Sequence, residues 1–450
     1  MRNVIIIGSG PAGYTAAERA ANNGLSVVIF EKADIGGVCL NEGCIPTKTL
    51  LYSAKLVENA RAAGKYGVLV ENVHFDYAKI IARKNKVVRK LNAGIRAKLN
   101  HENIKSVIGE VSILESSEEG IRLLCQSEEL LVRNLLICTG SHNFFPPIPG
   151  ITPETVWTSR EALASKELPL SLAIIGGGAI GMEFAGFFNT LGVEVTVVEM
   201  MDEILGNMDK EISGLLREEY AKKGIRFHLQ SKVLELRDNE LIFEKAGEKM
   251  SIKAERVLLS VGRKPNLDGL GLENFPIETL RGGIVVNEQM QTSVPQIYAA
   301  GDVTGFSLLA HTAVREAEVA VNRMLGLADS MSYATIPGVV YTNPEVAGVG
   351  ETEESLRAQN KVYHVSKRPM SFSGRYVAEN EGGSGLCKIL SDEKGKVLGV
   401  HLIGNPASEV ISLATLAMEH GLTVAQWQKS VFPHPTVGEI LKETLFEQGR

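Results

Sequence analysis

The run Val4-Ile-Ile-Ile-Gly8-Ser-Gly10-Pro-Ala-Gly13 decides the fold, because it recurs as Ala173-Ile-Ile-Gly176-Gly-Gly178-Ala-Ile-Gly181. In each copy an apolar run precedes the glycines and a helix-like run of small residues follows them. A second apolar run then ends in an acid, Glu31 in the first copy and Glu199 in the second. A strand, a glycine turn, a helix and a strand ending in an acid make a dinucleotide-binding βαβ unit. The sequence therefore predicts two such units.

The three glycines of this fingerprint have different physical tasks. The first permits a tight turn, the second lets the backbone approach a pyrophosphate at a helix N-terminus, and the third allows a helix to pack closely on a strand. The acid at the end of the second strand accepts hydrogen bonds from a ribose. A single glycine pattern is weak evidence, since glycine turns without a ligand are common. Repetition of the whole strand, turn, helix and acid makes the prediction specific.

The composition is that of a soluble globular protein. Hydrophobic residues make up 44 % of the chain and charged residues 22 %, and the 45 glycines are typical of tight turns or nucleotide loops. The length suggests roughly three domains. A formal charge of −6, without a long block of either sign, argues against nucleic acid or an anionic membrane as a partner. No apolar run is long enough for a signal peptide or a membrane-spanning helix.

The chain has five cysteines, Cys39, Cys44, Cys125, Cys138 and Cys387, which are too few and too scattered for a disulfide framework. Only the first two lie close together in the sequence. Reducing compartments retain disulfides mainly where these are catalytic, so we expect a cytoplasmic protein with one special cysteine pair. A zinc site is disfavoured, because no second Cys or His pair has the spacing of metal ligands.

Other segments indicate how the rest of the chain is organised. A basic, helix-like stretch covers residues 80–99, and Pro146-Pro-Ile-Pro-Gly150 is typical of a linker. A short strand and turn precede a helix-like run at 310–325. From about residue 333 the tail predicts a separate α+β domain. Its expected strands are 338–341, 385–390 and 397–403, and its expected helices are 408–420 and 437–447.

The cysteine pair lies in Cys39-Leu-Asn-Glu-Gly43-Cys44-Ile-Pro46-Thr-Lys48, directly after the first βαβ unit. In a regular helix, residues five apart have Cα atoms about 8.6 Å apart, which exceeds the roughly 7 Å that a disulfide tolerates. A disulfide there requires distorted backbone, which Gly43 permits. Pro46 suits the first position of a helix, so Cys44 is expected at a helix N-terminus, where the macrodipole favours a thiolate. The alternative is two unpaired buried cysteines.

A histidine near the C-terminus has the surroundings of a general base. Pro433 and Pro435 hold the backbone on both sides of His434 in extended form. Glu439 can keep the imidazole in one tautomer, and dithiol oxidation needs a base that works near neutral pH. Thr436 and Glu439 also spell a capping box, in which Glu439 is the third residue of a helix. A merely packed histidine is the other alternative.

Four motifs together resemble those of one enzyme family. They are Gly37-Val-Cys39-Leu-Asn-Glu-Gly-Cys44-Ile-Pro-Thr-Lys48, Gly301-Asp302, Tyr341-Thr-Asn-Pro-Glu-Val-Ala347 and His434-Pro-Thr. On these motifs the chain resembles, over essentially its full length, the pyridine nucleotide disulfide oxidoreductases, and within them the dihydrolipoamide dehydrogenases. Phe432 is a departure, since many lipoamide enzymes carry a histidine there, and Glu42 and Cys138 replace small or apolar residues.

The resemblance implies a role for each matching residue. Cys39 is the interchange thiol that meets the substrate sulfur, and Cys44 lies against the flavin. Lys48 and Glu183 form a charge pair beside the flavin and the nicotinamide. The implied FAD-binding residues are Gly8, Gly10, Gly13, Glu31, Lys48, Gly109, Asp302, Ala310 and His311. The implied NAD-binding residues are Gly176, Gly178, Gly181, Glu199, Val233 and Gly262.

The implied fold class is α/β, with two Rossmann-like dinucleotide-binding domains for FAD and NAD and a C-terminal α+β dimerisation domain. The expected limits are 1–145 for the FAD-binding domain and 146–264 for the NAD-binding domain. Residues 265–332 are expected to form a central segment that completes the FAD site, and residues 333–450 the dimerisation domain.

The resemblance also implies partners and a reaction. His434, oriented by Glu439, faces the cysteine pair of the partner subunit in a homodimer. Dihydrolipoamide reduces the Cys39–Cys44 disulfide, the dithiol reduces FAD, and NAD is reduced to NADH. The implied partners are a lipoyl-bearing carrier protein or lipoyl domain, and the E2 subunit of a 2-oxoacid dehydrogenase or glycine-cleavage complex.

Two alternative functions remain open. One is another FAD-dependent disulfide reductase, such as a glutathione-type reductase that uses NADPH, although Ile45-Pro-Thr-Lys48 favours the lipoamide branch. Mercuric reductase is more remote, because the tail Leu445-Phe-Glu-Gln-Gly-Arg450 has no cysteine pair. The other alternative is a flavin-binding redox sensor without turnover. The intact cysteine pair and His434 argue against a sensor.

Overall fold

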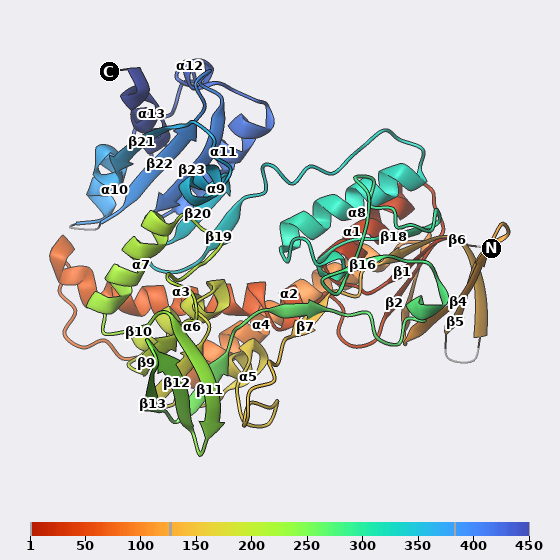
Figure 1. Cartoon of the computed structure of the whole chain (residues 1–450), viewed down its shortest axis with the longest axis horizontal. Helices are drawn as coiled ribbons and strands as arrows, with labels where there is room; N and C mark the ends of the chain where they lie inside the picture. The colour runs from red at the N-terminus through yellow and green to blue at the C-terminus, as the bar shows by residue number, and fades with distance from the viewer. Residues whose placement is uncertain (1, 126–127, 382–383, 450) are drawn as a thin grey trace. The chain divides into compact units, whose positions relative to one another are not determined.

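The structure is a computed structural model that describes residues 2–125, 128–381 and 384–449. The chain forms two compact units, each made of three segments (Figure 1). The first unit comprises Met1–Thr49, Ile81–Phe144 and Gly262–Ser332, and the second comprises Leu50–Ile80, Phe145–Val261 and Tyr333–Arg450. No helix in the described chain is long and apolar enough to cross a membrane.

The first unit is built on a seven-stranded sheet with the order β3-β2-β1-β6-β5-β4, in which β18 also pairs with β6. The parallel strands are β1 (Arg2–Ile7), β2 (Val27–Glu31), β3 (Ile104–Ile108), β6 (Glu128–Ile137) and β18 (Ile297–Ala299). The antiparallel strands β4 (Val111–Ser117) and β5 (Gly120–Cys125) extend it. The core strands are continuous apolar runs, as strands covered on both faces require.

Two helices of the first unit lie side by side (Figure 1). They are α1 (Pro11–Asn22) and α8 (Ala310–Met324). The buried residues of α1 are Ala and Gly, so α8 can approach its backbone closely, and Arg19 donates a hydrogen bond to Asn322 at 2.8 Å. The first unit also contains α2 (Gly37–Asn41), most of α4 (Tyr77–Leu99), the ribbon of β7 (Ser141–Asn143) with β15 (Arg263–Pro265), and β16 (Thr279–Leu280) with β17 (Gly283–Ile284).

The second unit repeats the same βαβ arrangement. Its parallel sheet has the order β10-β9-β8-β14, with β8 (Ser171–Ile175), β9 (Glu194–Val198), β10 (Arg226–His228) and β14 (Arg256–Leu259). Helix α6 (Ala179–Thr190) joins β8 to β9, and α7 (Lys210–Lys222) precedes β10. An antiparallel sheet of β11 (Ser231–Arg237), β12 (Glu240–Lys245) and β13 (Glu248–Lys253) follows. Both predicted βαβ units are thereby confirmed.

The C-terminal part of the second unit is an antiparallel sheet with the order β19-β20-β23-β22-β21. Its strands are Gly338–Val340, Val346–Gly350, Val397–Ile403, Leu386–Ser391 and His364–Pro369 in that order. Its helices are α9 (Glu353–Ala358), α10 (Gly374–Glu379), α11 (Ala407–Glu419), α12 (Val424–Trp427) and α13 (Glu439–Leu445). The three predicted strands and two predicted helices are confirmed, with limits that shift by one or two residues. The strands β20 and β21 and the helices α9, α10 and α12 were not predicted.

Because side chains alternate along a strand, β22 faces two different environments. Cys387 and Ile389 join the apolar core with α11 and α13. Lys388, between them, is almost fully buried and bonds Asp209 at 2.9 and 3.0 Å and Glu353 at 2.7 Å. Asp209 also caps α7. Burial opposes the charge of Lys388, but Glu211, which lies 2.7 Å away, together with Glu353 and Asp209 outweighs it and raises the pKa of Lys388. The cluster therefore fixes α7 to the C-terminal sheet.

We expect Lys388→Met to lower the free energy of unfolding by about 3–5 kcal/mol, because it leaves the buried Asp209 carboxylate uncompensated. Chemical denaturation measures the change. The matched control is Lys222→Met, since Lys222 pairs with Glu219 but is largely exposed, and such pairs contribute at most about 1 kcal/mol. An equal loss of unfolding free energy in the two variants would contradict the stabilising role given to the buried cluster around Lys388.

Candidate functional site

Two glycines of the first turn, Gly8 and Gly13, leave no room for a side chain. Gly8 has φ +101°, and a Cβ there would lie 2.3 Å from the carbonyl oxygen of Cys138. A Cβ on Gly13 would lie 1.9 Å from the carbonyl oxygen of Gly8. Gly10 is the N-cap residue of α1. A Cβ on Gly37 would lie 2.7 Å from the Cα of Gly10, so the segment that leads to Cys39 passes directly over this turn. Such a bare helix N-terminus fits a pyrophosphate.

The acid of the first βαβ unit is held in a fixed position. Glu31 accepts hydrogen bonds at one oxygen from the backbone N–H and the hydroxyl of Ser9, at 2.9 and 2.7 Å. The other oxygen accepts from the N–H of Ala33 at 2.9 Å. The N–H of Gly109 donates to the carbonyl of Glu31 at 2.9 Å, which places Gly109 at the same edge of the sheet. This geometry fits the ribose contact expected of Glu31.

Asp302 lies in the first unit with two partners that the sequence did not reveal. The hydroxyl of Ser141 donates to Asp302 at 2.6 Å, and Arg263 donates to that hydroxyl and to the Ser141 carbonyl, both at 2.7 Å. Burial raises the pKa of Asp302, with Ser141 and Arg263 acting in the opposite direction. The N–H of Gly301 donates to the fully buried Glu316 at 2.6 Å.

The two cysteines lie on either side of a break between two helices. Cys39 belongs to α2, and Cys44 is the first residue of α3 (Cys44–Ala62). The carbonyl of Gly43 accepts hydrogen bonds from the N–H and the hydroxyl of Thr47, at 3.1 and 2.6 Å. The predicted break and the position of Cys44 are confirmed. The helix starts two residues earlier than expected, but Pro46 still lies in its first turn, where the missing N–H of a proline costs no hydrogen bond within the helix.

The structure shows the pair as a dithiol, with both side chains half-buried. A hydrogen bond to Cys44, followed by burial and the charge of Cys44, raises the pKa of Cys39, while Lys48 acts in the opposite direction. The side chains of Cys39 and Cys44 therefore lie within hydrogen-bond distance of each other. Burial and the charges of Cys39 and Cys44 also raise the pKa of Tyr14, which places that ring beside the pair. Tyr14 was missed, because only the fold brings α1 to the cysteines.

The second glycine turn reproduces the first. Gly176 also has φ +101°, and a Cβ there would lie 2.6 Å from the carbonyl oxygen of Ser260. Gly178 caps α6, and a Cβ on Gly181 would lie 2.2 Å from the carbonyl oxygen of Gly176. One oxygen of Glu199 accepts from the N–H of Gly177 at 2.5 Å. This bare helix N-terminus and fixed acid again fit a dinucleotide.

Cations close in sequence to Glu199 are already paired with acids. Lys210 bonds Asp202 at 2.5 Å, and Arg217 bonds both oxygens of Glu203 at 2.9 and 3.0 Å. The other oxygen of Glu199 accepts from the N–H of Met201. Lys210 and Arg217 are therefore neutralised by acids of their own.

Several expected site residues are placed individually. Ala310 and His311 begin α8. Val233 is buried on β11, and Gly262 has φ +116°. Glu183 is buried on α6 and accepts a hydrogen bond from the N–H of Tyr341 at 3.0 Å. The pairing of Glu183 with Lys48 stays a prediction, as do the nucleotide contacts of the other four residues.

His434 is held by its acid and left open on its other side. Its Nδ1 lies 2.9 Å from Glu439, and the side chain is 79 % exposed. Since a carboxylate can only accept, Nδ1 carries the proton and Nε2 is the free base. A hydrogen bond from the Thr436 N–H, followed by one from His434, lowers the pKa of Glu439. This exposure argues against the packed-histidine alternative.

The capping box is only half formed. Glu439 accepts from the N–H of Thr436 at 2.8 Å, but the Thr436 hydroxyl donates to the carbonyl of Pro433. Helix α13 begins at Glu439, so Glu439 is its first residue and not its third. The Glu439 carboxylate therefore both orients His434 and holds the backbone of Thr436, which precedes the helix.

Comparison with known proteins agrees with this geometry. Residues 2–317 match the family model described as "Pyridine nucleotide-disulphide oxidoreductase", and residues 336–445 match the dimerisation domain of the same family. The chain belongs to this family. It is an oxidoreductase that uses FAD and NAD, and its C-terminal part is a dimerisation domain.

Curated relatives and solved structures cover almost the whole chain. A "Dihydrolipoyl dehydrogenase" from Mycoplasma pneumoniae is 36 % identical over 99 % of both chains. One from Thermus scotoductus is 39 % identical over 98 % of this chain and 96 % of its own. Among solved structures, LpdA from Mycobacterium tuberculosis has a TM-score of 0.90 and 26 % identity over all of both chains. The flavoprotein disulfide reductase RclA from Escherichia coli has a TM-score of 0.85 and 28 % identity over 99 % of both.

Proposed function

We propose that this chain is a dihydrolipoyl dehydrogenase, which oxidises protein-bound dihydrolipoamide and reduces NAD to NADH. The observation that carries the proposal is the Cys39–Cys44 dithiol, which spans a helix break beside the first glycine turn. The relatives named dihydrolipoyl dehydrogenase, each more than a third identical over at least 98 % of this chain, support the choice of substrate.

In the proposed reaction, a substrate thiolate attacks the Cys39 sulfur of the oxidised pair. The Cys39–Cys44 bond breaks, and Cys44 leaves as a thiolate at the N-terminus of α3, where the helix dipole stabilises it. His434 Nε2 of the partner subunit then takes the proton of the second substrate thiol. That thiolate attacks the substrate sulfur of the mixed disulfide and releases lipoamide and Cys39. When bound in the first unit, FAD would supply the acceptor for the electron pair of the Cys39–Cys44 dithiol, with NAD as the final acceptor.

The proposed cofactor assignment follows the two glycine turns. Gly8, Gly10 and Gly13, with Glu31 and Asp302, hold FAD, which places it in the same unit as the cysteine pair. Gly176, Gly178 and Gly181, with Glu199, hold NAD. Within the first unit, the closeness of the Gly10 turn to Gly37 supports FAD there.

A homodimer is proposed from the dimerisation domain and from an apolar groove on it. The groove has a volume of about 680 Å³ and is lined by α11, α12 and the segment that leads to His434. Leu416 is 59 % exposed there and Val431 is 92 % exposed. A second subunit seated on this groove would cover both side chains and contact the segment that carries the base. The lipoyl-bearing carrier, an E2 subunit and a cytoplasmic location are part of the same proposal.

Steady-state turnover tests the proposed function directly. We expect the purified holoenzyme to oxidise dihydrolipoamide with NAD, and to reduce glutathione disulfide with NADPH at a rate lower by a factor of about 100 or more. Preference for glutathione disulfide would identify a glutathione-type reductase instead. Absence of turnover with every dithiol would point to a flavin redox sensor.

We expect NAD to be preferred over NADP by roughly 30-fold or more in kcat/KM, because a 2′-phosphate brings like charge against Glu199. Glu199→Ser should reduce kcat/KM for NAD, and with it the ratio of kcat/KM for NAD to kcat/KM for NADP. Glu194→Gln is the control, since Glu194 is an exposed acid at the other end of the same strand and pairs with Arg226. An unchanged ratio in Glu199→Ser would contradict the role given to Glu199.

A further inference from the structure

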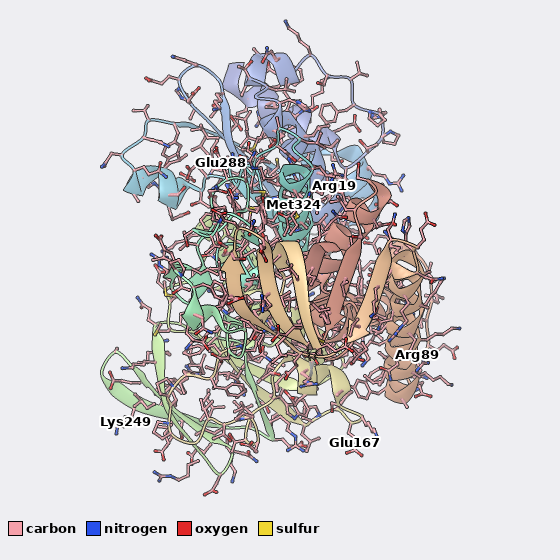
Figure 2. The ribbon with its side chains drawn as sticks, turned by 90° about the vertical axis from the view of Figure 1, so that its right-hand side faces the viewer. Arg19, Arg89, Glu167, Lys249, Glu288 and Met324 are labelled. Carbon is pink, nitrogen blue, oxygen red and sulfur yellow. The ribbon has the colours of Figure 1, made fainter. Side chains whose placement is uncertain are left out.

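Helix α4 carries a strongly basic surface that the proposed reaction does not use. Its 23 residues include eight Lys or Arg and no Asp or Glu. Arg89 extends outward from this helix (Figure 2). Lys86, Lys90 and Arg96 are exposed as well, and the four recur at helical spacing along one side. Among the described residues no carboxylate lies within ion-pair distance of these four, in a chain whose net charge is −6.

Helix α4 is also hydrogen-bonded to the segments that carry the cysteines. Asn92 donates a hydrogen bond at 2.8 Å to Asn41, which is the last residue of the Cys39 helix. Arg83 donates at 3.2 Å to the carbonyl of Thr49, one turn into the Cys44 helix. All these residues belong to the first unit. The basic surface of α4 is therefore rigidly linked to the dithiol.

We propose that the exposed basic side of α4, formed by Lys86, Arg89, Lys90 and Arg96, receives the acidic surface of the carrier domain that presents the dithiol. This proposal rests on the proposed function. A substrate on a protein-bound arm reaches Cys39 only while its carrier is nearby, and opposite charge raises the local concentration of a carrier and its association rate. Within the described part of the chain the four cations have no carboxylate partner, and α4 is hydrogen-bonded to the segments of Cys39 and Cys44. They therefore favour a carrier domain whose surface is acidic around its dihydrolipoyl arm.

Nucleic acid is the competing polyanion, but the sequence does not favour it. Between Lys79 and Leu99, α4 has no aromatic side chain on which a base could stack. The carrier is thus the better match to this surface.

The test uses three short peptides with a dihydrolipoyl-lysine, flanked by aspartates, by serines or by lysines, together with free dihydrolipoamide. We expect the wild-type holoenzyme to oxidise the aspartate peptide with a kcat/KM roughly ten-fold above that of the lysine peptide. The difference should vanish at about 0.5 M salt, where the screening length falls to roughly 4 Å. In Arg89→Gln/Lys90→Gln most of the difference in kcat/KM between the aspartate and lysine peptides should vanish even at low salt. The kcat/KM for free dihydrolipoamide should not change.

The matched control is Lys249→Gln/Lys253→Gln, which removes the same charge from β13 and should keep the full peptide difference. Equal kcat/KM for the three peptides in the wild type, or an equal loss in both double variants, would overturn the docking proposal. Tighter binding of a duplex oligonucleotide than of the aspartate peptide, lost in Arg89→Gln/Lys90→Gln, would assign the surface to nucleic acid. Failure to oxidise even free dihydrolipoamide would instead refute the proposed function.

Discussion

We expect Cys39→Ser to lose turnover by a factor of at least about 10³, because the sulfur that forms the mixed disulfide is absent. Cys44 keeps its place at the start of α3, so its thiolate still lies against FAD in the proposed site. The variant should therefore retain the long-wavelength absorbance that a thiolate in contact with a flavin produces. Stopped-flow absorbance and steady-state rates measure the two properties on the same sample.

Cys44→Ser should lose both the turnover and the absorbance. Cys125→Ser is the control, since Cys125 is a buried thiol at the end of β5 and should leave both properties intact. The reverse pattern, in which the absorbance disappears in Cys39→Ser and persists in Cys44→Ser, would mean that the roles of the two cysteines are interchanged.

We expect His434→Ala to reduce kcat/KM for dihydrolipoamide by roughly 10²- to 10⁴-fold, the usual contribution of a general base. Glu439→Ala removes the acceptor that holds the proton on Nδ1, so it should also lower kcat/KM, by a smaller factor than His434→Ala. An unchanged kcat/KM in Glu439→Ala would contradict the pairing of the two side chains.

A heterodimer of Cys39→Ser and His434→Ala chains tests whether the base comes from the other subunit. One of its two sites combines both defects, and the other combines the intact cysteine pair with an intact His434. Roughly half of the wild-type activity should return, although each parent homodimer is nearly inactive. A purified heterodimer no more active than its parents would show that the base acts within its own chain.

Local sequence patterns predicted what depends on neighbouring residues. The two βαβ units follow from apolar runs, glycines and a terminal acid at repeated spacing, and the helix break between Cys39 and Cys44 follows from the distance limit of a disulfide. The pairing of His434 with Glu439 was equally accessible, because the two side chains lie five residues apart.

Contacts between distant segments were not accessible. Ser141 and Arg263 meet at Asp302 only because β7 pairs with β15. Lys388 appears in the sequence as an ordinary charge in an apolar strand, and the carboxylates that justify its burial come from α7 and α9. The predicted capping box of Thr436 and Glu439 was only half right. The Thr436 hydroxyl donates a hydrogen bond to the carbonyl of Pro433 and does not cap the helix.

The redox state of each cysteine, before and after one equivalent of dihydrolipoamide, tests the central claim most directly. The air-oxidised holoenzyme is treated without oxygen, alkylated at once and mapped by mass spectrometry. We predict that Cys39 and Cys44 become alkylated only after the dithiol is added, while the buried Cys125, Cys138 and Cys387 do not change. A flavin that is reduced while Cys39 and Cys44 keep their labelling unchanged would contradict transfer of electrons through this pair.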